Sequence, residues 1–270
     1  MAFFASSEDG RPALVVRSVI VFVAVTVWWL VLYRGADLVF GAEYGRGRHV
    51  AAAVGATLGT VPLIYATRRF LDRRPWSGLG LSSIGRGWRP FLFGAACWGI
   101  PALLSAAVMI SLGWAELTVR APVPQTLSAI LALLALVLLY EAFPEELIFR
   151  GYFFANLRER WPTAATVLGQ AALFTAWGVL IGAAGSLDRA LFFFAFSAVQ
   201  GALRATTGNV WACIGFHTTF QVTTQFLAGK WDYIDLDDPD MAVIGLAFGV
   251  IPFTSTALLL WLYARKQRQS

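Results

Sequence analysis

The sequence predicts an all-α fold, a polytopic membrane bundle of about eight transmembrane helices, and two observations carry this prediction. Of the 270 residues, 58% are hydrophobic and 14% are charged, and the mean hydropathy is +0.65. A soluble domain has about 25% charged residues. Several apolar runs also reach the roughly 20 residues that a helix needs to cross a bilayer. We therefore expect a single membrane domain over residues 1–270.

Eight apolar segments account for the predicted helices. The first follows a polar start, Met1–Gly10, which carries Glu8 and Asp9 and lacks the form of a cleavable signal. All but the sixth fall within the range of about 17–25 residues that a spanning helix needs, and we expect neighbours to shield the sixth. The segments are Leu14–Tyr33, Val50–Thr67, Phe91–Trp114, Leu127–Ile148, Ala164–Ala184, Leu191–Ala202, Trp211–Ala228 and Met241–Tyr263.

The basic residues are spread unevenly over the loops, which predicts an orientation. If the loop Arg68–Pro90 is cytoplasmic, alternation places both termini in the cytoplasm and the acidic loop Asp232–Asp240 outside. Fifteen of the 21 basic residues then lie inside, as the positive-inside rule requires. The same distribution argues against a nucleic-acid partner despite the net charge of +5. The expected partner is the lipid bilayer.

Glu145 and Glu146 are the most informative pair in the chain. They follow the very apolar run Leu127–Tyr140, and an ionised carboxylate in hydrocarbon is costly unless it is paired or lines a polar cavity. Arg150 lies four residues after Glu146, so those two can share a helix face and pair, which leaves Glu145 as the freer carboxylate. A carboxylate in an apolar pocket suits a general base that acts on water. The alternative is that these groups only hold helices together.

Two neighbours modify this site. Pro144 removes a backbone N–H, and the kink that it predicts would open the helix beside the carboxylates. Glu141 lies one turn before Glu145 and supplies a third acidic group, which either pairs with a basic side chain on another span or stays protonated.

His217 and Gln221 form the second constellation. They are four residues apart and share one face of the seventh predicted span. A hydrogen-bonded core histidine is the plainer interpretation, but the pairing with an amide and the nearby carboxylates favour a site. The other histidine, His49, lies at a loop edge, where we expect it to be solvated. A third stretch, Phe174–Gly178, is rich in aromatic residues and is by itself typical of a core.

In this order the three pieces resemble the CPBP family of intramembrane proteases, which contains the type II CAAX prenyl endopeptidases and the Abi proteins. The family's first motif, Glu-Glu-x-x-x-Arg, is matched in full by Glu145, Glu146 and Arg150. The likeness covers roughly Leu127–Leu227.

The other two motifs depart from the family pattern. The second, Phe-x-x-x-His, aligns with Phe174–Gly178, which places Gly178 where the family has a histidine. The third, His-x-x-x-Asn or Asp, aligns with His217 to Gln221, so that a longer amide side chain replaces Asn.

The resemblance implies hydrolysis of peptide bonds within the membrane. By analogy Glu145 activates water, His217 and Gln221 steady the oxyanion, and Glu146 with Arg150 supports them. The histidine that helps the family's glutamate is missing. Water in the space at Gly178, or the nearby Glu141, would have to take over part of its task.

A metal is only weakly indicated. A catalytic zinc normally takes three protein ligands, which Glu145, His217 and Glu141 could supply, but nothing in their spacing demands it. We therefore expect no cofactor, with a divalent metal such as zinc as the alternative.

Three functions fit the sequence. The first is an endopeptidase that cleaves membrane-proximal tails of proteins or peptides, lipid-modified tails included. The second is a catalytically inactive relative that binds peptides or serves as an immunity or accessory protein, which Gly178 and Gln221 favour. The third is an unrelated transporter whose carboxylates and histidine relay protons. The usage of Ala, Gly, Arg and Trp is typical of bacteria, so we expect a location in a bacterial plasma membrane.

Overall fold

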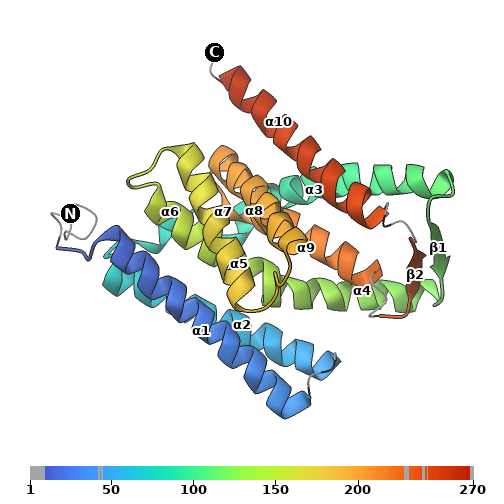
Figure 1. The fold of residues 1–270 in the computed structure, drawn as a ribbon, viewed down its shortest axis with the longest axis horizontal. Helices are drawn as coiled ribbons and strands as arrows, with labels where there is room; N and C mark the ends of the chain where they lie inside the picture. The colour runs from blue at the N-terminus through green and yellow to red at the C-terminus, as the bar shows by residue number, and fades with distance from the viewer. Residues whose placement is uncertain are drawn as a thin grey trace.

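The computed structural model describes residues 10–41, 43, 45–227, 231–238, 241 and 243–267. Within these ranges it is a bundle of long helices with one small sheet, which confirms the predicted all-α fold (Figure 1). The long helices are α1 (Leu14–Phe40), α2 (Arg46–Ala66), α3 (Ile84–Ser111), α4 (Val123–Val137), α7 (Thr163–Leu180), α8 (Leu187–Thr207), α9 (Val210–Leu227) and α10 (Ile251–Gln267), and the short ones are α5 (Phe143–Glu146) and α6 (Phe154–Leu157).

Six helical segments of the described chain are long and apolar enough to cross a membrane, so the chain is an integral membrane protein. They hold α1, α2, α3, the continuous run from α4 to α6, α7 and α10. The sequence also predicted spans at α8 and α9, which are not among the six. Both helices carry polar side chains, such as Gln200 and Gln221, that lower their hydropathy. The sixth predicted span is longer than expected, since α8 has 21 residues.

The helix that carries Glu145 and Glu146 is continuous but irregular. Wider π-helical turns occupy Leu138–Ala142 and Leu147–Phe153 on either side of α5. Pro144 lies inside α5, and the wider turn before it accommodates a residue that cannot donate a backbone hydrogen bond. Turns of this kind are rare and frequently occur at functional sites. The helix runs on to the end of α6, well past the predicted boundary at Ile148.

Helix α9, which carries His217, packs closely along α3. A side chain at Gly94 would come within 1.8 Å of the Ala212 carbonyl oxygen, and one at Gly215 within 1.9 Å of the Phe91 carbonyl oxygen. In membranes, small residues let helix backbones approach each other in this way. The two glycines therefore fix the depth and direction of α9 in the bundle.

The sheet joins two loops that are far apart in sequence. Strand β1 (Glu116–Val119) pairs antiparallel with β2 (Ile234–Asp237), with Glu116 opposite Asp237 and Val119 opposite Ile234. This ties the loop before α4 to the segment after α9. The sequence predicted only an acidic loop at β2.

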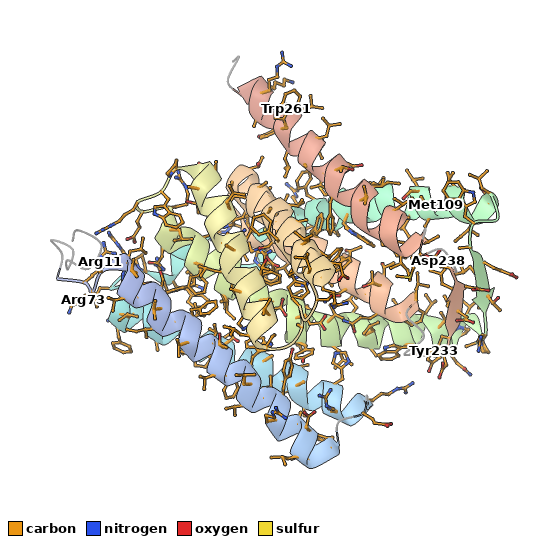
Figure 2. All side chains as sticks on the ribbon, in the orientation of Figure 1. Arg11, Arg73, Met109, Tyr233, Asp238 and Trp261 are labelled. Carbon is orange, nitrogen blue, oxygen red and sulfur yellow. The ribbon has the colours of Figure 1, made fainter. Side chains whose placement is uncertain are left out.

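The two ends of the bundle carry different residues. We call the basic end the one at which α1, α3, α7 and α9 begin; Arg11 and Arg73 lie there (Figure 2). We call the strand end the one that holds β1 and β2, where Tyr233 and Asp238 lie (Figure 2).

A buried ionic network lies at the basic end. The Oδ1 atom of Asp72 accepts hydrogen bonds from Arg17 (2.8 Å) and from the Tyr152 hydroxyl (3.1 Å). Its Oδ2 atom accepts from Arg68 (3.2 Å) and from the Asn156 amide (3.1 Å). The network fastens α1 and the end of α2 to the segment that follows the first motif.

Candidate active site

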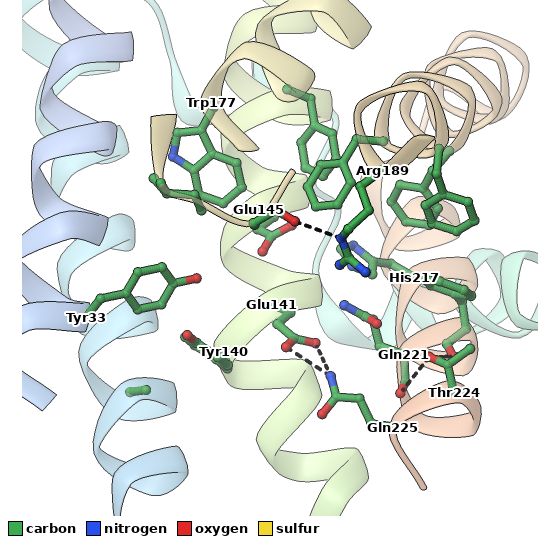
Figure 3. A pocket seen from close by; sticks show the side chains of 18 of the residues that line it. Tyr33, Tyr140, Glu141, Glu145, Trp177, Arg189, His217, Gln221, Thr224 and Gln225 are labelled. Atoms are coloured by element: carbon green, nitrogen blue, oxygen red, sulfur yellow. Dashed lines mark hydrogen bonds between the residues drawn. The ribbon is translucent and has the colours of Figure 1, made fainter. Parts of the chain in front are cut away.

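A cavity of about 450 Å³ lies in the middle of the bundle. Its walls come from α1 and α2 on one side, from the α4–α5 run in the centre, and from α7, α8 and α9 on the other side (Figure 3). The cavity brings together Glu145, His217 and Gln221, which lie up to 76 positions apart in the chain. Aromatic side chains of α7 and α8 form much of the remaining wall.

Glu145 points its carboxylate into this cavity (Figure 3). It is 9% exposed. Among the residues that the structure describes, none forms a hydrogen bond or ion pair with this carboxylate. An otherwise buried carboxylate that faces a cavity is available to water and to a ligand, as a general base must be.

Glu146 has the opposite surroundings, although it is the next residue. It is fully buried, and its Oε1 atom is 2.8 Å from His217 Nδ1, 3.1 Å from Arg150 Nη1 and 3.2 Å from the Gln200 amide nitrogen. The ion pair expected from the four-residue spacing of Glu146 and Arg150 thus forms. Glu146 therefore positions the histidine.

The Arg150 guanidinium is buried against aromatic rings. Its central carbon is 4.8 Å from the Phe174 ring centroid and 5.8 Å from that of Phe196. An arginine over an aromatic face is stabilised by the ring quadrupole, and more so when it is desolvated. The second oxygen of Glu146, Oε2, has no hydrogen-bond partner in the described part of the chain. Only one of the two carboxylate oxygens of Glu146 is thus paired among the described residues.

His217 is held from two sides. Phe196 packs edge-on against its ring, with centroids 4.8 Å apart, and the carboxylate of Glu146 accepts a hydrogen bond when Nδ1 carries the proton. A carboxylate that accepts from one ring nitrogen fixes the tautomer and the orientation of the ring. The Nε2 atom forms no hydrogen bond with any residue in the described ranges, and the ring lines the cavity.

Gln221 and Glu141 lie farther along the same cavity. Gln221 is one turn beyond His217 on α9, and its side chain lines the wall (Figure 3). Glu141 accepts hydrogen bonds from the Gln225 amide at 3.0 and 2.7 Å. The sequence predicted a basic partner or a proton for Glu141, and the structure places the neutral amide of Gln225 on α9 among its partners.

Gly178 does not face an empty space. A Cβ atom built at this position would lie 2.7 Å from two ring carbons of Phe193 and 3.4 Å from Ala184. Carbon atoms in contact are about 3.5–4.0 Å apart. The ring of Phe193 therefore occupies the space that a histidine side chain would need. The absence of a side chain at Gly178 does not leave a gap for the water molecule that the sequence suggested as one substitute.

The structure corrects the interpretation of His49. It is buried in the first turn of α2 rather than solvated, its ring packs edge-on against Tyr140 at 5.5 Å, and it lines the cavity. Arg189, at the start of α8, also lines the cavity and donates from Nε to the Ala183 carbonyl (3.1 Å, Figure 3). Neither residue belongs to a motif, so only the packing of the helices reveals them.

The donor set does not match a metal site. In the part of the chain that the structure describes, no three His, Cys, Asp or Glu side chains come together as metal ligands would. Glu145, His217 and Glu141, the ligands that the sequence offered, share the cavity without forming such a group.

The chain was compared with protein families, curated proteins and solved structures. Residues 126–223 match the family model described as type II CAAX prenyl endopeptidase Rce1-like. No curated protein and no solved structure matches the chain. The matched segment runs from α4 to α9 and includes Glu145, Glu146, Arg150, Gly178, His217 and Gln221. The resemblance predicted from the three motifs is thus confirmed for residues 126–223, which are similar to the Rce1-like type II CAAX prenyl endopeptidases.

Proposed function

We propose that the protein is an intramembrane endopeptidase that hydrolyses peptide bonds in membrane-proximal tails of proteins or peptides, with Glu145 as the general base. The observation that carries the proposal is the contrast between the two adjacent glutamates. Glu145 faces a cavity and has no hydrogen-bond partner among the described residues, whereas Glu146 contacts His217 and Arg150. Burial and the family assignment support the same site.

The reaction follows from these positions. Glu145 removes a proton from a water molecule, and the water oxygen attacks the carbonyl carbon of the scissile bond. The carbonyl oxygen then carries the negative charge, which the imidazolium of His217 and the amide of Gln221 stabilise as hydrogen-bond donors. When the C–N bond breaks, protonated Glu145 returns its proton to the leaving amine.

Glu146 acts in this scheme through His217. Its carboxylate stabilises the imidazolium form that donates from Nε2, and Arg150 keeps Glu146 in place. Both are positioning residues, because neither lines the cavity.

A second candidate function is peptide binding without hydrolysis, as in an accessory or immunity protein. The observation that favours it is Phe193, which fills the position of the family's second-motif histidine. Loss of one general acid–base group typically costs about 10²–10⁴ in rate. The cavity and the Glu146–His217 pair would still hold a peptide.

The test compares wild type with Glu145→Gln, a variant of the same shape, in liposomes that contain a mixture of short tail peptides, some of them lipid-modified. Cleavage and peptide binding are measured in the same preparation. We expect wild type to cleave and Glu145→Gln to bind without cleaving. A matched control is Glu116→Gln, an exposed carboxylate on β1, which should cleave like wild type. Binding without cleavage by wild type would establish the second function, and equal cleavage by Glu145→Gln would exclude Glu145 as the base.

A further inference from the structure

We infer that the cavity takes its peptide from the non-cytoplasmic side of the membrane, so that the substrate is an exported tail or the outer segment of a membrane protein. That this peptide is cleaved rests on the proposed function; the side from which it enters does not. Two independent observations carry the inference: the end of the bundle toward which the cavity lies, and the distribution of charge between the two ends.

The cavity extends from the middle of the bundle toward the strand end. Apart from the residues of the central α4–α5 run, most of its lining residues come from the later turns of α1, α7 and α9 and from the earlier turns of α2 and α8, and Phe196 and His217 lie near the middle of their helices. All of these turns lie toward the strand end, because α1, α7 and α9 begin at the basic end and α2 and α8 run in the opposite direction. Tyr33, Arg48 and Arg189 mark this part of the wall.

The path from the cavity toward the basic end is filled. Beyond Glu145, the π-helical segment Leu147–Phe153 is buried at every residue. Tyr152 in this segment donates to Asp72, and Arg204 of α8 donates to the Arg150 carbonyl (3.1 Å) and to the Leu79 carbonyl (3.2 Å). These bonds link the segment to the turn that follows α2, to α8 and to the loop before α3. A peptide could not reach Glu145 from that end without breaking this packing.

Charge separates the two ends. Basic residues dominate the basic end and acidic residues the strand end, within the described ranges. The basic end holds Arg11, Arg17, Arg68, Arg69, Arg73, Arg74, Arg86, Arg89, Arg158, Arg160, Arg204, Arg265 and Lys266 with Asp72 and Glu159; the strand end holds Arg34, Arg46, Arg48, Arg120 and Arg189 with Asp37, Glu43, Glu116, Asp188, Asp232, Asp235, Asp237 and Asp238.

Short loops that carry an excess of Lys and Arg are retained in the cytoplasm. The basic end therefore faces the cytoplasm and the strand end faces the opposite side. Since the cavity lies toward the strand end, a peptide enters it from outside the cytoplasm. The orientation also places both termini in the cytoplasm, because α1 begins and α10 ends toward the basic end.

Cysteine labelling tests this in the full-length protein without any need for cleavage. The two native cysteines, Cys97 and Cys213, are buried and are first replaced by alanine. Single cysteines then report the cavity (Thr224→Cys, with Ala183→Cys as a second position), the strand end (Glu116→Cys) and the basic end (Arg69→Cys). Thr224 and Ala183 line the cavity, whereas Glu116 and Arg69 are exposed.

The probe is a membrane-impermeant maleimide, applied to intact bacterial cells and to inverted membrane vesicles. We expect at least tenfold more labelling of Thr224→Cys, Ala183→Cys and Glu116→Cys in intact cells, and the reverse for Arg69→Cys. Labelling of both cavity positions with Arg69→Cys would overturn the proposed entry side. Labelling of Glu116→Cys only in inverted vesicles would overturn the orientation. Failure of both cavity cysteines to label from outside would overturn it as well, whatever the outcome of the Glu145→Gln assay.

Discussion

Asp72 and Glu146 are both fully buried carboxylates that face arginine, but they are satisfied to different degrees. Both oxygens of Asp72 accept hydrogen bonds, four in all, from Arg17, Arg68, Tyr152 and Asn156. Glu146 uses only Oε1, and its Oε2 has no partner in the described ranges. Buried polar groups are nearly always paired, so an unpaired one needs an explanation.

The difference separates a structural network from a candidate site. Asp72 joins three parts of the chain and does not line the cavity of the candidate site, so its network can be complete. Glu146 instead supports His217, which faces the cavity, and one oxygen of Glu146 is left without a hydrogen bond among the described residues. Local rules of structure are most often broken at functional sites. A buried carboxylate–arginine pair alone would not have identified the site.

The largest expected effect is on stability, at Asp72. Asp72→Asn keeps the shape but leaves Arg17 and Arg68 buried beside a neutral amide. Removal of one partner of a buried ion pair costs roughly 3–5 kcal/mol. We expect a clearly lower thermal unfolding midpoint in detergent. The control is Asp37→Asn, which breaks a half-exposed pair with Arg48 and should change the midpoint little, since exposed pairs are worth about 0–1 kcal/mol. Equal midpoints for the two variants would contradict the structural role of Asp72.

The second effect is on catalysis, at Glu146. Glu146→Gln removes the charge that stabilises the His217 imidazolium, and loss of one oxyanion donor costs about 10²–10³ in kcat. We expect kcat to fall to that extent with KM nearly unchanged, because Glu146 lies outside the cavity wall. A rise in KM at constant kcat would instead assign Glu146 to peptide binding. The activity is measured on the peptides that wild type cleaves.

The third effect concerns Gly178. Gly178→His alone should lower the unfolding midpoint, because the new side chain collides with Phe193 and overpacking typically costs about 1–3 kcal/mol. Gly178→His combined with Phe193→Ala should recover part of this loss and raise the cleavage rate. Gly185→His is the matched control, since the nearest atom to a Cβ there is 3.9 Å away. Additive stability effects of the two substitutions would show that Phe193 does not fill this space.

Much of the helical architecture could be predicted because the bilayer restricts it. A span needs a minimum length of apolar residues, and the eight predicted segments all correspond to long helices. The pairing of Glu146 with Arg150 was equally local, since residues four apart on a helix are neighbours. The predicted end of the helix that carries Glu145 was wrong, because the apolar run in the sequence stops near Ile148 although the helix continues. Its continuation depends on Tyr152 and Asn156, which bond to Asp72 from a distant part of the chain.

The cavity itself could not be predicted. His49 lines the cavity because the α1–α2 pair packs against the helix that carries Tyr140 and Glu145. Nothing near His49 in the sequence indicates that contact. The departure at Gly178 was visible in the sequence, but its consequence was not: whether water or a side chain takes the space depends on Phe193 from the next helix. The motif residues could thus be identified from the sequence, but the residues that pack around them could not.

The smallest effect is expected at Glu159, at the margin of the Asp72 network. Glu159 lies after α6, outside the spans; burial opposes its ionisation, but hydrogen bonds and charges from Arg17 and Arg11 outweigh this and lower the pKa of its carboxyl below 4.5. A lowered pKa adds stability above the unfolded-state value, which is lost as the pH falls through the folded-state value. The unfolding midpoint should therefore decline below about pH 4.5, and Glu159→Gln should have a shallower decline than wild type. Glu116→Gln, at the strand end, is the control; a decline in Glu159→Gln as steep as in wild type would mean that this carboxylate is not linked to folding.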